Sequence, residues 1–81
     1  MFFVYALYSV NFNRIYIGMS QNPSKRLTEH NAGKTKSTKA FIPWILVFQK
    51  ETESTVNARE LEKYYKTTTG RRIIKEIIDK L

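Results

Sequence analysis

Five side chains in this sequence combine chemical types that work well together: two tyrosines, an arginine, a histidine and a glutamate. They are Tyr5, Tyr16, Arg26, His30 and Glu60. The planar fork of an arginine matches phosphate oxygens, and a histidine can move a proton near neutral pH. A carboxylate placed among apolar residues must be paired or must bind a metal. These types suit chemistry on a phosphate if the fold brings them together.

The two tyrosines lie in segments that predict strands, over residues 2–9 and 14–19. If the strands pair so that the numbers of paired residues sum to 23, Tyr16 lies opposite Leu7 and Tyr5 lies on its diagonal. Both hydroxyls then point from one face of the hairpin. A slip of one residue would separate them. Two strand tyrosines are also common as core or sheet-surface residues, so this reading stays open.

Arg26 and His30 are four residues apart on a predicted helix and therefore share a face. Leu27 is the only large aliphatic residue between Asn22 and Asn31, so it marks the inward side. At 100° per residue, the arginine and the histidine flank that inward side, where side chains can line a cleft. The alternative is a solvated helix face that carries an incidental Arg-His pair.

Glu60 is four residues from both Val56 and Tyr64, which predicts a carboxylate on the apolar stripe of its own helix. A glutamate there needs a partner or a metal. The alternative to a metal is a structural pair with Lys63. Glu62, by contrast, is predicted on the solvent side of the helix in an ordinary ion pair.

The elements that must position these residues follow from periodicity and capping signals. In order they are strands over 2–9 and 14–19, a helix over 22–31, a strand over 44–48, a helix from 54 to about 66 and a terminal helix over 73–81. The continuous apolar run Trp44–Phe48 predicts a strand covered on both faces, and hence a central one. The order ββαβαα predicts a three-stranded sheet with helices packed on it.

The length of 81 residues predicts one domain over 1–81. Fourteen Lys and Arg against seven Asp and Glu give a net charge of +7, which favours a polyanionic partner, most often a nucleic acid. Solubility charge alone is the other reading. Lys34, Lys36 and Lys39, together with Arg26, are the predicted nucleic-acid-binding rim. The absence of cysteine, of a signal peptide and of a long apolar run predicts a cytoplasmic protein without a membrane partner.

The order of these segments resembles the GIY-YIG nuclease superfamily. Phe3-Val4-Tyr5, eleven residues before Tyr16-Ile17-Gly18, resembles the paired motif of that family. The segment 22–34 resembles the stretch with the family's helix arginine and its partner four residues on, and 43–47 resembles a third strand. Residues 54–60 resemble the stretch with the metal-binding glutamate. The chain is similar to the short single-domain bacterial members, which are themselves similar to the nuclease domain of the excision-repair protein UvrC.

The resemblance implies an α/β fold with a small three-stranded antiparallel sheet and cleavage of phosphodiesters that depends on Mg²⁺ or Mn²⁺. It implies that Glu60 holds a single metal ion, and that Tyr5 and Tyr16 position or deprotonate the attacking water. It further implies that Arg26 neutralises the scissile phosphate and that His30 assists proton transfer. The sequence departs from the family in the residues before Tyr5, in Met19 and in having no asparagine after Glu60.

Two classes of function follow from this reading. The first is a metal-dependent DNA endonuclease that acts in repair or recombination. The second is a nucleic-acid-binding module that kept the fold and has little or no turnover. The presence of all five site residues favours the enzyme. Target choice would come from the surface of the domain or from a protein partner.

Overall fold

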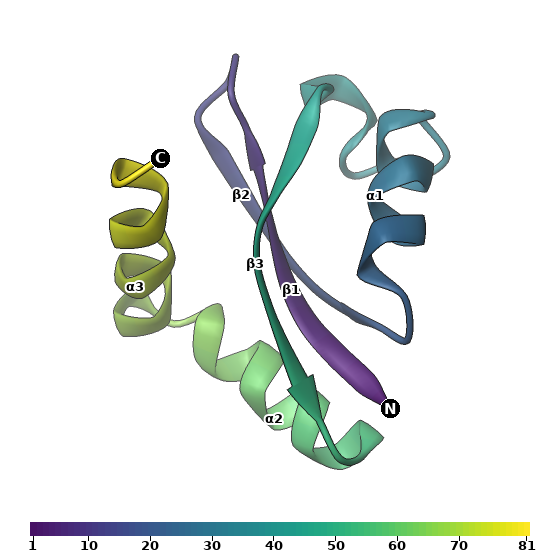
Figure 1. The fold of residues 1–81 in the computed structure, drawn as a ribbon. Coiled ribbons are helices and arrows are strands. Elements are labelled where there is room, and N and C mark those ends of the chain that lie inside the picture. The colour runs from purple at the N-terminus through teal and green to yellow at the C-terminus, as the bar shows by residue number, and fades with distance from the viewer.

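The computed structural model describes residues 1–81 as three strands, three α-helices and one short 3₁₀ helix. The elements are β1 (Phe2–Ser9), β2 (Arg14–Ser20), α1 (Pro23–Asn31), the 3₁₀ helix η1 (Lys39–Phe41), β3 (Trp44–Thr52), α2 (Thr55–Tyr65) and α3 (Thr68–Asp79). Both strand pairs are antiparallel. Figure 1 shows α1 on one side of the sheet and α2 and α3 on the other. The predicted order ββαβαα and the three-stranded antiparallel sheet are confirmed.

The strand order is β2-β1-β3, so β1 is central and the prediction that Trp44–Phe48 forms the central strand is wrong. Four consecutive residues of β1, from Val4 to Leu7, are buried. In β3, Ile45 is 40% exposed. A continuous apolar run reports that both faces of a strand are partly covered, and helices cover an edge strand as well as a central one. The run alone therefore does not locate a strand within its sheet.

The pairing of β1 with β2 is the predicted one. Leu7 lies opposite Tyr16, and Tyr5 lies opposite Gly18. The turn is held at Asn13, which adopts a left-handed φ of 52° that asparagine tolerates well. Its side-chain oxygen accepts a hydrogen bond from the Tyr8 hydroxyl at 3.0 Å. The short turn fixes the register, and the register places both tyrosine side chains on the same face.

Alternate residues of β1 enter two separate core layers, as the period of a strand requires. The layer beneath α2 and α3 contains Val4, Ala6, Ile17, Ala58, Tyr65 and Ile74. The layer beneath α1 contains Tyr5, Leu7 and Trp44, with Tyr16 and Leu27 packed against them. The second layer is therefore aromatic and partly polar, and it holds the two tyrosines singled out above.

The helices α2 and α3 follow each other almost without a linker. Ser54 caps α2 by accepting a hydrogen bond from the backbone of Asn57 at 3.1 Å. Thr67 caps α3 in the same way, accepting from the backbone of Gly70 at 3.2 Å. Residues 67–70, which lie between the two predicted helices, are therefore the cap and first turn of α3, and this helix begins before the predicted residue 73. No helix of the molecule is long and apolar enough to cross a membrane.

Candidate active site

The helix α1 is fixed at both ends, and this sets the direction of its side chains. Asn22 caps the first turn by accepting from the backbone of Lys25 at 3.2 Å, with Pro23 at the first helical position. Near the other end, Asn31 binds both backbone groups of Trp44: it accepts from the nitrogen at 2.7 Å and donates to the oxygen at 3.0 Å. The helix is thereby tied to the start of β3, and its inward face is held against the aromatic layer.

His30 is fully buried in that layer, and both of its ring nitrogens are hydrogen-bonded. The Nδ1 atom lies 2.8 Å from the hydroxyl of Thr38, which itself donates to the backbone oxygen of Thr35 at 3.3 Å. Because the Thr38 hydroxyl donates its only hydrogen to Thr35, it can only accept a hydrogen bond from Nδ1–H of His30. The Nε2 atom then accepts from the Tyr5 hydroxyl, 3.2 Å away. This network assigns His30 as the neutral Nδ1–H tautomer.

The two tyrosines meet over Gly18 of β2. A Cβ atom built on Gly18 would lie 2.8 Å from the hydroxyl oxygen of Tyr5 and 3.0 Å from a ring carbon of Tyr16. Glycine is thus required for the close approach of both rings to the strand. The ring centroids of the tyrosines are 6.2 Å apart, and that of Tyr16 is 4.8 Å from that of His30. The structure brings these three predicted residues into one cluster.

Arg26 joins the cluster through Tyr5. Burial raises the pKa of Tyr5, and the guanidinium of Arg26 opposes that effect by hydrogen bonding and by charge. Arg26 also forms an ion pair with Glu29 one turn along the helix, an interaction that raises the pKa of Arg26 and lowers that of Glu29. The Arg26 side chain is still 34% exposed. A partly exposed guanidinium beside the Tyr5 phenol can therefore meet an anion that arrives from solvent.

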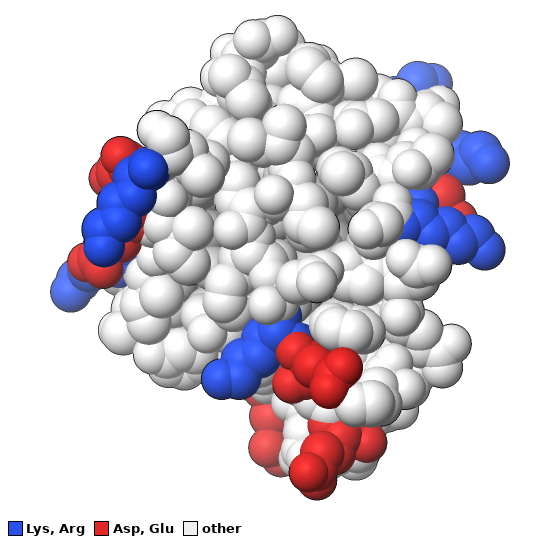
Figure 2. Space-filling model, in the orientation of Figure 1, with Lys and Arg blue, Asp and Glu red and all other residues white.

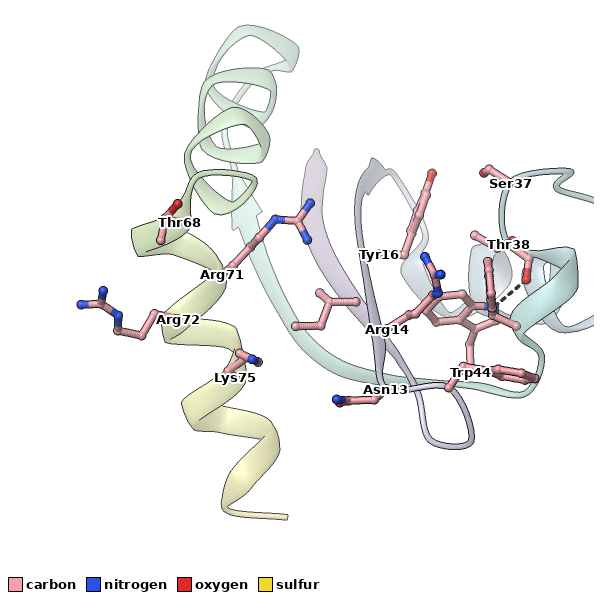
Figure 3. Close-up of a pocket in the computed structure, with 13 residues that line it drawn as sticks. Asn13, Arg14, Tyr16, Ser37, Thr38, Trp44, Thr68, Arg71, Arg72 and Lys75 are labelled. Carbon is pink, nitrogen blue, oxygen red and sulfur yellow. Dashed lines mark hydrogen bonds between the residues drawn. The ribbon is translucent and has the colours of Figure 1, made fainter.

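A large cleft reaches this cluster from outside, and Tyr16 lines it. Its volume is about 820 Å³, and it extends along the outer side of β2 between the loop near Thr38 and α3. Figure 3 shows Tyr16 and Arg14 on one side of the cleft and Arg71 pointing toward them from α3. Tyr5, by contrast, is only 1% exposed. Of the two tyrosines, Tyr16 is the one that a bound molecule would touch.

Glu60 lies away from this cluster, and the prediction that it sits on the apolar stripe of its helix is wrong. Glu60 is exposed, as are its neighbours Val56, at 66%, and Tyr64, at 42%. It lines a separate shallow groove together with Glu53. In Figure 2, acidic side chains gather at this end of the molecule, over the end of β3 and the start of α2. The buried face of α2 is the one that contains Ala58 and Tyr65.

Glu62 carries the carboxylate that acts on the cluster, although the sequence predicts it on the solvent side of its helix. Its side chain is 21% exposed and pairs with Lys66 at 3.6 Å. The negative charge of Glu62 adds to burial in raising the pKa of Tyr5, which places this carboxylate within electrostatic reach of the phenol. Its spacing of four from the buried Ala58 is the signal that could have identified it.

The lysines of the predicted nucleic-acid-binding rim lie outside this cleft. Lys34, Lys36 and Lys39 are exposed, but none of them lines the cleft. The cations that line it are Arg14, Arg71, Arg72 and Lys75. Three of these recur at helical spacing on one face of α3, beside its apolar face. The helical spacing of these cations is the sequence signal for this stripe.

The cluster offers few protein ligands to a hard divalent cation. No three His, Asp or Glu side chains lie close enough together to hold a metal. Glu62 supplies one partly buried carboxylate, and the hydroxyl of Tyr16 supplies an oxygen on the cleft side. Mg²⁺ accepts this kind of site, because it keeps several waters and takes one or two carboxylates together with phosphate oxygens. The residues therefore fit a metal whose shell the substrate completes.

The chain matches the family model described as the GIY-YIG catalytic domain over residues 1–75. The match covers every element of the sheet and the whole of the aromatic cluster. The protein belongs to the GIY-YIG family, whose members are generally endonucleases with a divalent metal and DNA as substrate. Searches of curated proteins and of solved structures gave no significant match.

The ion pair between Arg26 and Glu29 predicts a variant with tighter DNA binding. In Glu29→Gln the guanidinium loses its internal partner and is freed for a phosphate. We expect DNA affinity, measured in EDTA at low salt, to rise by about two- to fivefold. Glu53→Gln, which removes the same charge from the distant groove, is the matched control. Equal gains in both variants would mean that only the net charge matters.

The chain has a single histidine, so its titration can be followed in the intact protein. Burial, followed by the charge of Arg26, holds the pKa of His30 below its ordinary value near 6.5. As the pH falls, His30 therefore takes up a proton more readily in the unfolded chain than in the folded chain. Stability from this group is complete above pH 6.5 and is lost as the pH falls toward the lowered value. Thermal melts between pH 7.5 and 5 should show this loss, and His30→Gln should lack it.

Proposed function

We propose that the protein is a divalent-metal-dependent endonuclease that hydrolyses DNA phosphodiester bonds at the cluster beside the cleft. The observation that carries the proposal is the convergence of Tyr5, Tyr16, Arg26 and His30 in one cluster, with Tyr16 open to a basic cleft. These residues come from β1, β2 and α1, so no single element accounts for their meeting. A phosphate at this cluster would have the phenol of Tyr16 next to it, with Arg26 and Glu62 within electrostatic reach of the adjoining Tyr5.

Each side chain has a distinct part in this proposal. Tyr16, the accessible phenol, holds the attacking water by a hydrogen bond and orients it toward the phosphorus, and the proton of that water passes to solvent. Arg26 leaves Glu29 and stabilises the charge that develops on the phosphate oxygens. Tyr5 and His30 are positioning residues that hold Tyr16 and Arg26 in place. Glu62, rather than Glu60, would hold Mg²⁺ or Mn²⁺, and the metal would polarise the phosphate and lower the pKa of bound water.

A nicking assay on supercoiled plasmid tests this function. The protein should convert supercoiled DNA to nicked circles with Mg²⁺ or Mn²⁺ and should do nothing in EDTA. Arg26→Lys keeps the charge and loses the planar fork. We expect that variant to cut at least about tenfold more slowly while its DNA affinity stays within a few-fold. Plasmid that stays supercoiled with either metal would argue against the enzyme.

One observation favours the alternative, a nucleic-acid-binding module with little turnover. The cluster contains a single carboxylate and no group of three metal-binding side chains. Such a module would bind DNA through the cleft and leave plasmid intact. A role in repair or recombination, a protein partner that supplies target choice and a cytoplasmic location stay predictions from the sequence.

A further inference from the structure

The cleft continues past Tyr16 to an aromatic end at the turn between β1 and β2. Phe12, in that turn, is 50% exposed. Its ring meets the ring of Phe41 edge to face, with 5.5 Å between the centroids. The guanidinium of Arg14 lies 4.1 Å from the centre of the Phe41 ring. Phe41 is thus covered by two neighbours, whereas Phe12 presents aromatic surface to solvent inside a cleft.

The same cleft is positively charged along its length. Four cations line it and no carboxylate does: Arg14, Arg71, Arg72 and Lys75. None of the four is in an ion pair, since the two ion pairs of the molecule lie elsewhere. The Nε of Arg71 donates to the backbone oxygen of Lys66 at 3.2 Å, which orients its guanidinium. Neighbouring cations without counter-charges repel one another, and a polyanion in the cleft relieves that repulsion.

We propose that this end of the cleft binds an unpaired DNA strand, with a base stacked on Phe12 and phosphates against the four cations. A base inside a duplex is covered above and below by its neighbours, so an isolated aromatic ring stacks only on an unpaired or terminal base. The volume of about 820 Å³ is in the range of pockets that enclose small ligands. A cleft that combines cations with an exposed aromatic is the usual form of a single-strand site.

This inference rests on the proposed function, because Tyr16 at the inner end of the cleft is the phenol assigned to the reaction. It adds the substrate class. A strand held at Phe12 and running along β2 would bring a phosphate to Tyr16. The preferred DNA would then carry an unpaired segment next to the bond that is cut, as a fork or an overhang does. A long blunt duplex exposes a base face only at its two ends, so it would bind almost entirely through its phosphates.

Binding to two DNA molecules tests the inference without any catalysis. The affinity of the whole protein for a labelled single-stranded oligonucleotide and for the blunt duplex of the same sequence is measured in EDTA. Phe12→Ala should weaken single-strand binding about tenfold and duplex binding less than about twofold. Val10→Ala is the matched control, since Val10 is 54% exposed in the same turn but does not line the cleft. Phe12→Trp, which keeps the stacking surface, should bind single strands as the native protein does.

Three results would overturn the inference: equal losses for both DNA molecules, no loss in Phe12→Ala, or a Phe12→Trp protein as weak as Phe12→Ala. These binding measurements need no turnover, so their outcome is independent of whether the protein is a nuclease. A protein that leaves forked DNA and plasmid uncut with Mg²⁺ and Mn²⁺, yet binds single strands through Phe12, supports the strand site and removes the enzyme. A protein that cuts plasmid without any effect of Phe12→Ala on single-strand binding keeps the enzyme and removes the strand site.

Discussion

Replacing Glu62 with glutamine should abolish metal-dependent cleavage, while the same change at Glu60 should leave it intact. Glu62 is the carboxylate that acts electrostatically on Tyr5, whereas Glu60 lies exposed in a distant groove. Glu62→Gln keeps the shape and removes the charge that a divalent cation needs. We expect plasmid nicking with Mg²⁺ or Mn²⁺ to fall at least about a hundredfold in Glu62→Gln and less than about twofold in Glu60→Gln.

Folding and DNA binding provide the controls for this pair. The ion pair that Glu62 makes with Lys66 is partly exposed, so its loss should change the free energy of unfolding by less than about 1 kcal/mol. Melting temperatures in EDTA should therefore be close for both variants and the native protein. Added Mn²⁺ should raise the melting temperature of Glu60→Gln but not of Glu62→Gln. The reverse pattern, with Glu60→Gln inactive, would return the metal to the position implied by the family resemblance.

Tyr16→Phe should reduce turnover by about a hundredfold or more and leave the fold unchanged. The Tyr16 hydroxyl makes no hydrogen bond within the protein and faces the cleft, so its removal strands no buried partner. Cleavage of plasmid and thermal melting, measured together, check both halves of the expectation. A variant that cuts at the native rate would exclude Tyr16 as the group that contacts the attacking water.

Tyr5→Phe provides the contrast, since it removes a hydroxyl that is buried. The loss leaves Nε2 of His30 without a donor, at a cost of about 1–3 kcal/mol in the free energy of unfolding. Turnover should fall through the lost placement of Arg26 and Tyr16, and by less than in Tyr16→Phe. If Tyr5→Phe is instead fully stable and inactive, Tyr5 contacts the substrate, and the accessibility of the two phenols changes when DNA binds.

Much of the fold is predictable because its signals are local. A hairpin with a short turn has one register that buries its apolar face, so the pairing of Leu7 with Tyr16 follows from the sequence. Caps at Asn22 and Ser54 locate two helix starts in the same way. The position of β3 at the edge of the sheet has no such local signal. It depends on which strands pair across long stretches of chain, and the apolar run of that strand does not encode it.

The candidate site shows the same contrast between local signals in the sequence and long-range packing. Spacing within one hairpin and one helix identifies Tyr5, Tyr16, Arg26 and His30. The carboxylate that we propose for the metal, Glu62, is not identified by spacing, because α2 carries apolar residues on two faces. One face contains Val56 and Tyr64 and is exposed; the other contains Ala58, Leu61 and Tyr65 and packs on the sheet. Only the packed structure decides between these faces, and it brings Glu62 within electrostatic reach of Tyr5.

The loop between α1 and β3 has a consequence for how freely this chain can vary. Connecting segments on a surface usually tolerate insertions and deletions. Here Thr38 receives two hydrogen bonds at once, from Nδ1 of His30 to its hydroxyl and from the indole of Trp44 to its backbone oxygen. A change in the length of the loop would move both contacts and leave the histidine without its orienting partner. The segment with the least regular structure is therefore among those whose length is most tightly constrained.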